Sequence, residues 1–227
     1  MINRVREVVD LVAVRNVLLS VADKSGLEEL VRGLLSVNPN MHFYSTGNTH
    51  RRISEVLGSS ASANLTRVSD YTGQPEMQGG LVKTLDFKIY LGLLSETDNP
   101  DHAADISRTG AVNFDLVVVN LYPFALAVAT PGASCEDARA HIDIGGPAML
   151  RAAAKNYLRV AALCDPKGYS SFIDDLTKQK GATSLRQRFE LCRKAFEHTA
   201  RYDTSISEYL TAIEVDEVAA TYSAREQ

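Results

Sequence analysis

One stretch of the chain places a carboxylate, a glycine pair and a lysine near one another. Asp143 comes just before Gly145 and Gly146. Pro147 then opens an alanine-rich run that ends at Lys155, and this composition predicts a helix. The glycines leave the first backbone N–H groups of that helix open to a negatively charged atom. These are groups that acyl chemistry uses, although a plain glycine turn into a packed helix is the alternative.

Two expected strand–turn–helix units place hydroxyl, lysine and glycine residues where each strand ends. The strands cover residues 16–21 and 41–44. In a parallel sheet their turns lie side by side at the carboxyl edge, where ligands usually bind. The turns form a candidate phosphate cradle, although helix capping by Ser or Thr explains each turn taken alone. The residues of this cradle are Lys24, Ser25, Ser45, Thr46, Gly47 and Thr49.

The most apolar expected strand covers residues 114–121 and is typical of the centre of a parallel sheet. Asn120 and Tyr122 stand at its carboxyl end, so we expect them near the phosphate cradle. A long stretch of turn-forming residues, 69–80, leads to Lys83. Lys83 has apolar neighbours that would weaken its preference for charge, unless its side chain reaches solvent.

The remaining segments follow the same strand and helix patterns. Residues 2–14 carry valines at helical spacing, which predicts an amphipathic helix docked on the body or on a partner subunit. We therefore expect an N-terminal helix over 1–15, an α/β domain over 16–210 and a partly disordered tail over 211–227. Further strands are expected over 64–68 and 160–164, helices over 99–110 and 185–210 and after Ser134, and a strand or buried segment over 88–94.

Composition limits the class of protein. Of the 227 residues, 45% are hydrophobic and 23% charged, and the net charge is only −4. These values are typical of a globular protein and do not favour nucleic-acid or acidic-membrane binding. The three cysteines, Cys135, Cys164 and Cys192, are too far apart for a disulfide framework or a metal site. We expect a cytoplasmic protein, because no apolar run has transmembrane length and the first 15 residues are too charged for a signal peptide.

Several motifs occur together in the order of one family. The chain resembles the inosine monophosphate cyclohydrolase domain of the bifunctional purine-biosynthesis enzyme, here as a stand-alone chain. The resemblance runs from about residue 16 to residue 210. The motifs that carry it are Asp23-Lys24-Ser25-Gly26, residues 69–77, Val82-Lys83-Thr84-Leu85, Asn120-Leu121-Tyr122-Pro123-Phe124, residues 142–147, residues 152–156 and residues 194–203.

This resemblance implies a methylglyoxal-synthase-like fold, with three α/β/α layers, a mainly parallel sheet and a helical C-terminal part. It implies ring closure of formamidoimidazole-carboxamide ribonucleotide to inosine monophosphate with loss of water, without a metal or other cofactor. It further implies a purine ribonucleotide substrate, a homodimer and a separately encoded formyltransferase as partner. No nucleic acid or membrane is expected to bind.

The resemblance also implies roles for individual residues. Asp143 would hold and polarise the reacting amides, and Lys155 with the N–H groups near Gly145 and Gly146 would stabilise the oxyanion. Lys83 would orient and tune Tyr122 in proton transfer. Thr84, Asn120, Gly145 and Gly146 join the phosphate cradle as substrate-binding residues.

The chain departs from the family at positions that flank the substrate pocket. Leu81 replaces an arginine, Asp86-Phe87 replaces His-Pro, and Tyr90 replaces a histidine. Leucine cannot make the paired hydrogen bonds that an arginine makes to an anion. Two interpretations therefore stay open, a cyclohydrolase and a non-catalytic nucleotide- or phosphometabolite-binding module. A scaffold for a separate formyltransferase is compatible with either.

Overall fold

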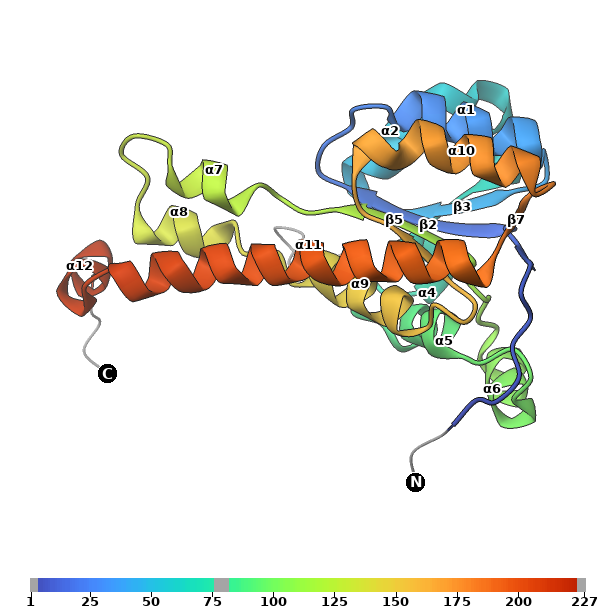
Figure 1. The fold of residues 1–227 in the computed structure, drawn as a ribbon. Helices are drawn as coiled ribbons and strands as arrows, with labels where there is room; N and C mark the ends of the chain where they lie inside the picture. The colour runs from blue at the N-terminus through green and yellow to red at the C-terminus, as the bar shows by residue number, and fades with distance from the viewer. Residues whose placement is uncertain (1–3, 76–81, 224–227) are drawn as a thin grey trace.

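The computed structural model describes residues 4–75 and 82–223 and contains a five-stranded parallel sheet (Figure 1). The strand order is β4-β3-β2-β5-β6. In the register Leu19 faces Ser45 and Val21 faces Asn120, so the strands end together at one carboxyl edge. The strands are β2 (Asn16–Val21), β3 (His42–Ser45), β4 (Leu65–Arg67), β5 (Leu116–Asn120) and β6 (Ala161–Leu163).

Helices cover both faces of this sheet, which confirms the expected three-layer fold (Figure 1). On one face lie α1 (Leu27–Val37), α2 (Gly47–Leu57) and α10 (Tyr169–Lys178). On the other lie α4 (Val68–Thr72), α5 (Phe87–Leu94), α9 (Gly145–Lys155) and the long α11 (Leu185–Ala212). Each helix buries its apolar stripe against the strands, and every residue of β5 is buried, as its apolar run predicts.

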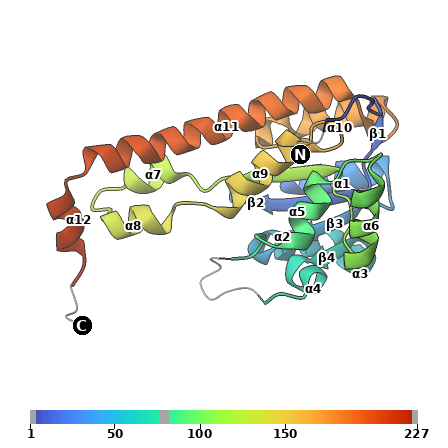
Figure 2. The ribbon, with the colours of Figure 1, turned by 90° about the horizontal axis from the view of Figure 1, so that it is seen from below.

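Smaller elements complete the chain. Asn99 caps α6 and accepts hydrogen bonds from two backbone N–H groups, and Ser134 and Asp137 form a capping box at α8. Figures 1 and 2 show α7, α8, the end of α11 and α12 extending away from the sheet. Within residues 4–75 and 82–223, no helix combines the length and apolar character needed to cross a membrane. The elements are α3 (Ala61–Asn64), α6 (Pro100–Thr109), α7 (Phe124–Val128), α8 (Cys135–Ala140), α12 (Val215–Thr221), and the 3-10 turns η1 (Gly58–Ser60) and η3 (Pro166–Gly168).

The amphipathic helix expected near the N-terminus is wrong for the described part of that segment. Residues 4–11 are not helical, and β1 (Val12–Ala13) pairs antiparallel with β7 (Ala182–Thr183). Segment 88–94 is helical rather than a strand, because Asp86 accepts a hydrogen bond from Lys88 N and so caps α5. In the tail, residues 215–221 form a helix.

The extended N-terminal segment is held by Arg188, a side chain of α11 that is fully buried. Its guanidinium donates to Val9 O at 3.1 Å and to Asp10 O at 2.9 Å. It also donates to Thr183 O and to the carbonyls of Tyr157 and Leu158. Five carbonyl groups from three separate segments therefore meet at one cation. These contacts favour extended backbone over the helix that the valine spacing predicts.

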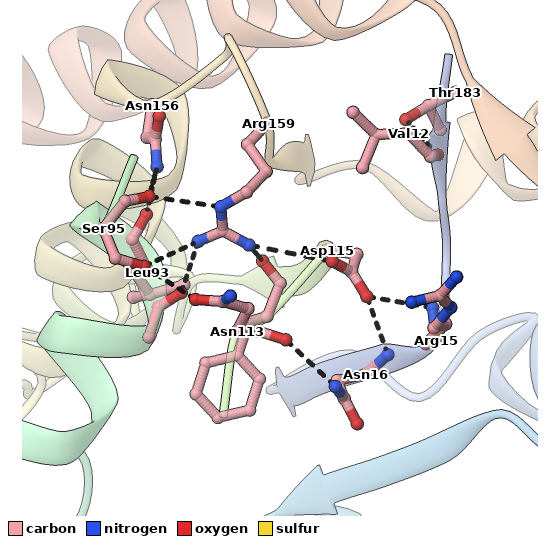
Figure 3. Close-up of polar contacts among 12 residues, drawn as sticks. Val12, Arg15, Asn16, Leu93, Ser95, Asn113, Asp115, Asn156, Arg159 and Thr183 are labelled. Carbon is pink, nitrogen blue, oxygen red and sulfur yellow. Dashed lines mark hydrogen bonds and ion pairs between the residues drawn. The ribbon is translucent and has the colours of Figure 1, made fainter. Parts of the chain in front are cut away.

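A second buried guanidinium stabilises the amino edge of the sheet (Figure 3). Arg159 donates to Gly92 O, Phe114 O and Ser95 O at 2.6, 2.8 and 3.2 Å. Its guanidinium lies 3.7 Å from the Asp115 carboxylate, which accepts hydrogen bonds from the backbone of residues 15 and 16. Burial lowers the pKa of Arg159 to about 10, so it stays charged at neutral pH.

We predict that Arg188→Met lowers the free energy of unfolding by about 3 kcal/mol or more, since five carbonyl groups lose a buried, charged donor. Denaturant unfolding at pH 7 measures the change. Arg186→Ala is the matched control on α11, because Arg186 is exposed and its ion pair with Glu190 lies at the surface. An equal loss of unfolding free energy in both variants would contradict the stabilising role of Arg188.

Candidate active site

The carboxylate of Asp143 lies against the first turn of α9. Its Oδ1 accepts a hydrogen bond from Gly146 N at 2.9 Å. Backbone N–H groups of Gly145 and Tyr122 also favour the ionised form, but burial is the larger effect and raises the pKa of Asp143. We call Asp143 and these three N–H groups the Asp143 pocket. It combines a partly desolvated carboxylate with donors at a helix N-terminus, as expected from the sequence.

Glycine is required at position 146 for a steric reason. A Cβ there would lie 2.5 Å from Asp143 Oδ2 and 2.7 Å from Leu121 Cδ2. A Cβ on Gly145 would lie 2.9 Å from Thr84 Oγ1. The carboxylate and a neighbouring threonine therefore pack directly on the backbone of the helix start. A side chain at residue 146 would displace the carboxylate from its N–H partners.

Tyr202 is a positioning residue that the sequence reasoning missed. It lies buried on α11, and its hydroxyl accepts a hydrogen bond from Asp143 N at 2.6 Å and donates to His141 O at 3.3 Å. Its ring packs edge-on against Phe124. The only sequence signal is its place inside the motif over residues 194–203. Tyr122, by contrast, is 56% exposed, so its ring is free to meet a ligand beside the pocket.

Lys83 and Thr84 connect the Asp143 pocket to the second turn of the phosphate cradle, which follows β3 and leads into α2. A Cβ on Gly47 would lie 3.4 Å from Lys83 Nζ, so this ammonium lies over the start of α2. Thr84 reaches the start of α9, as described above. In the described residues no hydrogen bond joins Lys83 to Tyr122. The geometry therefore supports an anion-binding position for Lys83 more directly than the proton-transfer role implied by the resemblance.

The start of α2 is the most open part of the phosphate cradle. Thr46 precedes the helix without a side-chain cap, so the Thr46 side chain does not satisfy the first N–H groups of this 11-residue helix, and no hydrogen bond to them from another side chain occurs in the described part of the chain. The hydroxyl of Ser45 is buried and donates to Leu19 O at 2.8 Å. Thr49 is also buried, and its hydroxyl donates to Val21 O at 3.1 Å. These two hydroxyls stabilise the turn, while the backbone and Lys83 remain for an anion.

In the first turn of the phosphate cradle, which follows β2, the polar side chains already form hydrogen bonds within the turn. Lys24 Nζ donates to the carbonyls of Val21 and Ala22, and burial lowers the pKa of Lys24. Ser25 Oγ donates to Asp23 Oδ1 at 2.6 Å. Both groups must leave these partners before they can bind a ligand.

Asn120 stabilises the same turn. Its Oδ1 accepts from Ala22 N at 2.6 Å and from Asp23 N at 2.9 Å, and its Nδ2 donates to Asp23 O. The side chain predicted to face the substrate therefore joins the carboxyl ends of β5 and β2 in this structure. It fixes the shape of the edge on which the Asp143 pocket lies.

Lys155 is not close to the Asp143 pocket within one chain. Gly145 begins α9 and Lys155 ends it, which separates them by about 15 Å at the helical rise per residue. Asn156, the next residue, donates to Leu93 O and Ser95 O near the amino edge of the sheet. Lys155 is exposed there. Its role in the reaction stays a prediction.

Comparison with known proteins accounts for this arrangement. Residues 26–148 match the MGS-like domain, and residues 153–227 match the AICARFT/IMPCHase bienzyme. The chain belongs to the MGS-like domain family. It is 42% identical over 209 residues to the bifunctional purine biosynthesis protein PurH of Neisseria meningitidis serogroup A, and 43% identical over 202 residues to that of Cyanothece sp..

The coverage of these relatives is unequal. The alignment with the Neisseria protein includes 92% of this chain but 38% of PurH, and that with the Cyanothece protein includes 89% and 38%. The chain thus spans less than half the length of these relatives. A crystal structure of ForH superposes with a TM-score of 0.71 at 31% identity, covering 86% of this chain and 98% of that one.

The departures from the cyclohydrolase pattern have partial explanations within this MGS-like domain. Asp86 is the N-cap of α5, and Phe87 is 64% exposed. Tyr90 has a buried hydroxyl without a hydrogen-bond partner in the described structure, and burial raises its pKa to about 12. Leu81 lies outside the described residues.

We predict that Tyr202→Phe lowers kcat about tenfold with little change in KM, since it removes one hydrogen bond that positions Asp143. Steady-state kinetics on the expected purine substrate measure both constants. Tyr209→Phe is the control, because Tyr209 also packs against Phe124 without contacting residue 143. A loss confined to stability, with kcat unchanged, would contradict the positioning role.

Proposed function

We propose that this chain is an inosine monophosphate cyclohydrolase acting at the end of purine synthesis. One observation carries the proposal: a partly buried Asp143 carboxylate lies against the N-terminus of α9, beside exposed Tyr122. The identity to PurH over nine-tenths of the chain supports the choice of substrate, formamidoimidazole-carboxamide ribonucleotide. Ring closure at this site joins the carboxamide nitrogen to the formyl carbon.

The reaction needs stabilisation of charge and movement of protons. When the carboxamide nitrogen attacks, the formyl oxygen becomes an oxyanion, which the N–H groups of Gly145 and Gly146 would stabilise by sharing their hydrogens between it and the Asp143 carboxylate. Asp143 accepts a hydrogen bond from the attacking amide and increases its nucleophilicity. The carboxamide nitrogen and the formamido nitrogen each lose one proton, the formyl oxygen leaves as water, and the ring is complete. Tyr122 is an exposed acid–base group whose backbone N–H contacts Asp143.

The ribose phosphate has a separate anchor in this proposal. The open N–H groups at the start of α2 and the ammonium of Lys83 provide positive charge for a phosphate. Thr84 lies between this anchor and the Asp143 pocket, which sets the distance between phosphate and reacting amide. Lys24 and Ser25 would join once they leave their present partners.

Lys155 fits the proposal only through a second copy of the chain. Within one chain α9 separates it from the Asp143 pocket, yet Lys155 is exposed and free to meet another molecule. We infer a homodimer in which each copy supplies Lys155 to the other copy's pocket. A two-fold symmetric dimer gives two equivalent sites of this kind.

A binding module is the second candidate function. The buried, unpartnered hydroxyl of Tyr90 and the change at Asp86 alter the wall where the family binds its substrate. A module of this kind, or a scaffold for a separate formyltransferase, would bind purine nucleotides without turnover. Catalysis by the purified chain separates the two functions.

We predict that Asp143→Asn lowers turnover about a hundredfold or more, because a preorganised polar contact is lost in the transition state. Ring closure is followed by absorbance, and inosine monophosphate should still raise the melting temperature of the variant. Asp105→Asn, in the middle of α6 and paired with Arg108, is the control and should keep full turnover. Near-normal turnover in folded Asp143→Asn would exclude the mechanism.

The shared site makes a second prediction. Asp143→Asn and Lys155→Ala should each be nearly inactive alone, yet co-expressed copies should regain about a quarter of wild-type activity, since half of the random two-fold dimers contain one intact site. Copies with different tags allow purification of the mixed dimer. No recovery in that dimer, or full activity of Lys155→Ala alone, would contradict the shared site.

A further inference from the structure

A groove of about 460 Å³ lies between α10 and α11, away from the Asp143 pocket. Figure 1 shows these two helices on opposite faces of the sheet. One wall comes from the loop after β6 and from α10, and the other comes from α11. Leu163, Phe172 and Leu191 give it an apolar floor. Its volume is within the range of small-molecule sites.

The α11 wall presents a row of basic groups. Lys194, His198 and Arg201 follow one another at i, i+4 and i+7, so they lie on one face of the helix. Lys167 faces them from η3. The proposed ring closure uses none of these side chains.

The acidic groups of the groove already have partners. Glu197 pairs with Arg201 at 3.6 Å, and Glu190 pairs with Arg186 at 3.4 Å. Asp175 pairs with Lys178. These contacts leave little free negative charge on the lining.

The carboxylate of Asp165 has a backbone N–H group as its partner. Its Oδ1 accepts a hydrogen bond from Lys167 N at 2.9 Å and so caps η3. Lys194 and the Lys167 ammonium have no ion pair within the described residues. The two lysines outnumber the one Asp165 carboxylate, which keeps its charge, so the charge left in the described lining of the groove is net positive.

His198 adds an unsatisfied polar atom. Its Nε2 is buried and lacks a hydrogen-bond partner in the described part of the chain, although the residue lines the groove. A buried polar atom without a partner is costly, so such an atom beside a cavity indicates a ligand. An oxyanion would satisfy a protonated Nε2 and the two lysines together.

We propose that this groove binds a small organic oxyanion, with Lys194, Lys167 and His198 on its phosphate or carboxylate and the apolar floor under its body. Arg201, about one turn beyond His198 on α11, also lines the groove and adds a positive charge near the bound oxyanion. The site is independent of the proposed ring closure, which leaves these residues unused.

Protonation of His198 is coupled to this binding. Burial and Arg201 lower the pKa of His198, and Asp165 opposes them. Lys194 and Lys167 add positive charge from the two walls, and burial raises the pKa of the Cys164 thiol to about 11, so it stays neutral. An oxyanion favours the protonated ring, so binding takes up a proton and tightens as pH falls toward the ordinary histidine pKa of about 6.5.

The experiment follows the His198 ring signals by NMR while phenyl phosphate, benzoate or benzyl alcohol is added. The first two probes distinguish phosphate from carboxylate, and the neutral alcohol tests the need for charge. We expect saturable shifts with at least one anion and none with the alcohol. Lys194→Ala should weaken binding about tenfold, the effect of one charge-assisted contact, whereas Arg193→Ala, an exposed cation of α11 outside the groove lining, should not.

Two results would overturn the proposal. One is the absence of saturable His198 shifts with either anion at millimolar concentration. The other is anion binding, measured by titration calorimetry so that the His198 ring is not needed, that Lys194→Ala and His198→Gln both leave unchanged. Loss of ring closure in Asp143→Asn has no bearing on either result, so failure here is distinct from failure of the proposed function.

Discussion

The direct packing of a carboxylate on the backbone of a helix start is the constraint on which the site depends. Residue 146 has no room for a Cβ beside Asp143 and Leu121, so α9 begins in contact with the carboxyl end of β5. The same contact places three N–H groups on the Asp143 carboxylate. Burial raises the pKa of this group while those N–H groups oppose the rise. The pocket is thus polar, partly desolvated and fixed before a ligand arrives.

The rest of the chain holds this contact from both sides. Asn120 joins the ends of β5 and β2, and Tyr202 of α11 holds the backbone of residue 143. At the far edge of the sheet, Arg159 and Arg188 gather carbonyl groups from distant segments. These two cations fix the helices that carry the pocket, which explains why buried charge occurs far from the chemistry. The fold therefore connects stability at the amino edge with geometry at the carboxyl edge.

Much of this fold follows from local patterns in the sequence. The apolar run of β5, the strand over residues 16–21 and the capped helices after Asn99 and Ser134 are confirmed, because burial and capping act over a few residues. The N-terminal helix is wrong because its competitor is Arg188, nearly 180 residues away. Segment 88–94 is apolar in nearly every position, so only the cap at Asp86 distinguishes helix from strand.

In the candidate site, too, features set by neighbouring residues could be predicted from the sequence, and features set by tertiary contacts could not. Asp143 with its glycines was predictable because the group lies within four residues. The contact of Lys83 with the start of α2, the inward hydroxyls of Ser45 and Thr49, and the contact of Tyr202 with residue 143 depend on tertiary packing. Sequence spacing also placed Lys155 near the pocket, whereas α9 carries it to the opposite edge.

Ring closure by the purified wild-type chain tests the central claim most directly. Formamidoimidazole-carboxamide ribonucleotide is mixed with the chain alone, and inosine monophosphate is followed by absorbance and confirmed by mass. The account predicts product formation at a rate proportional to the concentration of active dimer. Binding of the nucleotide without product above the uncatalysed rate would contradict it.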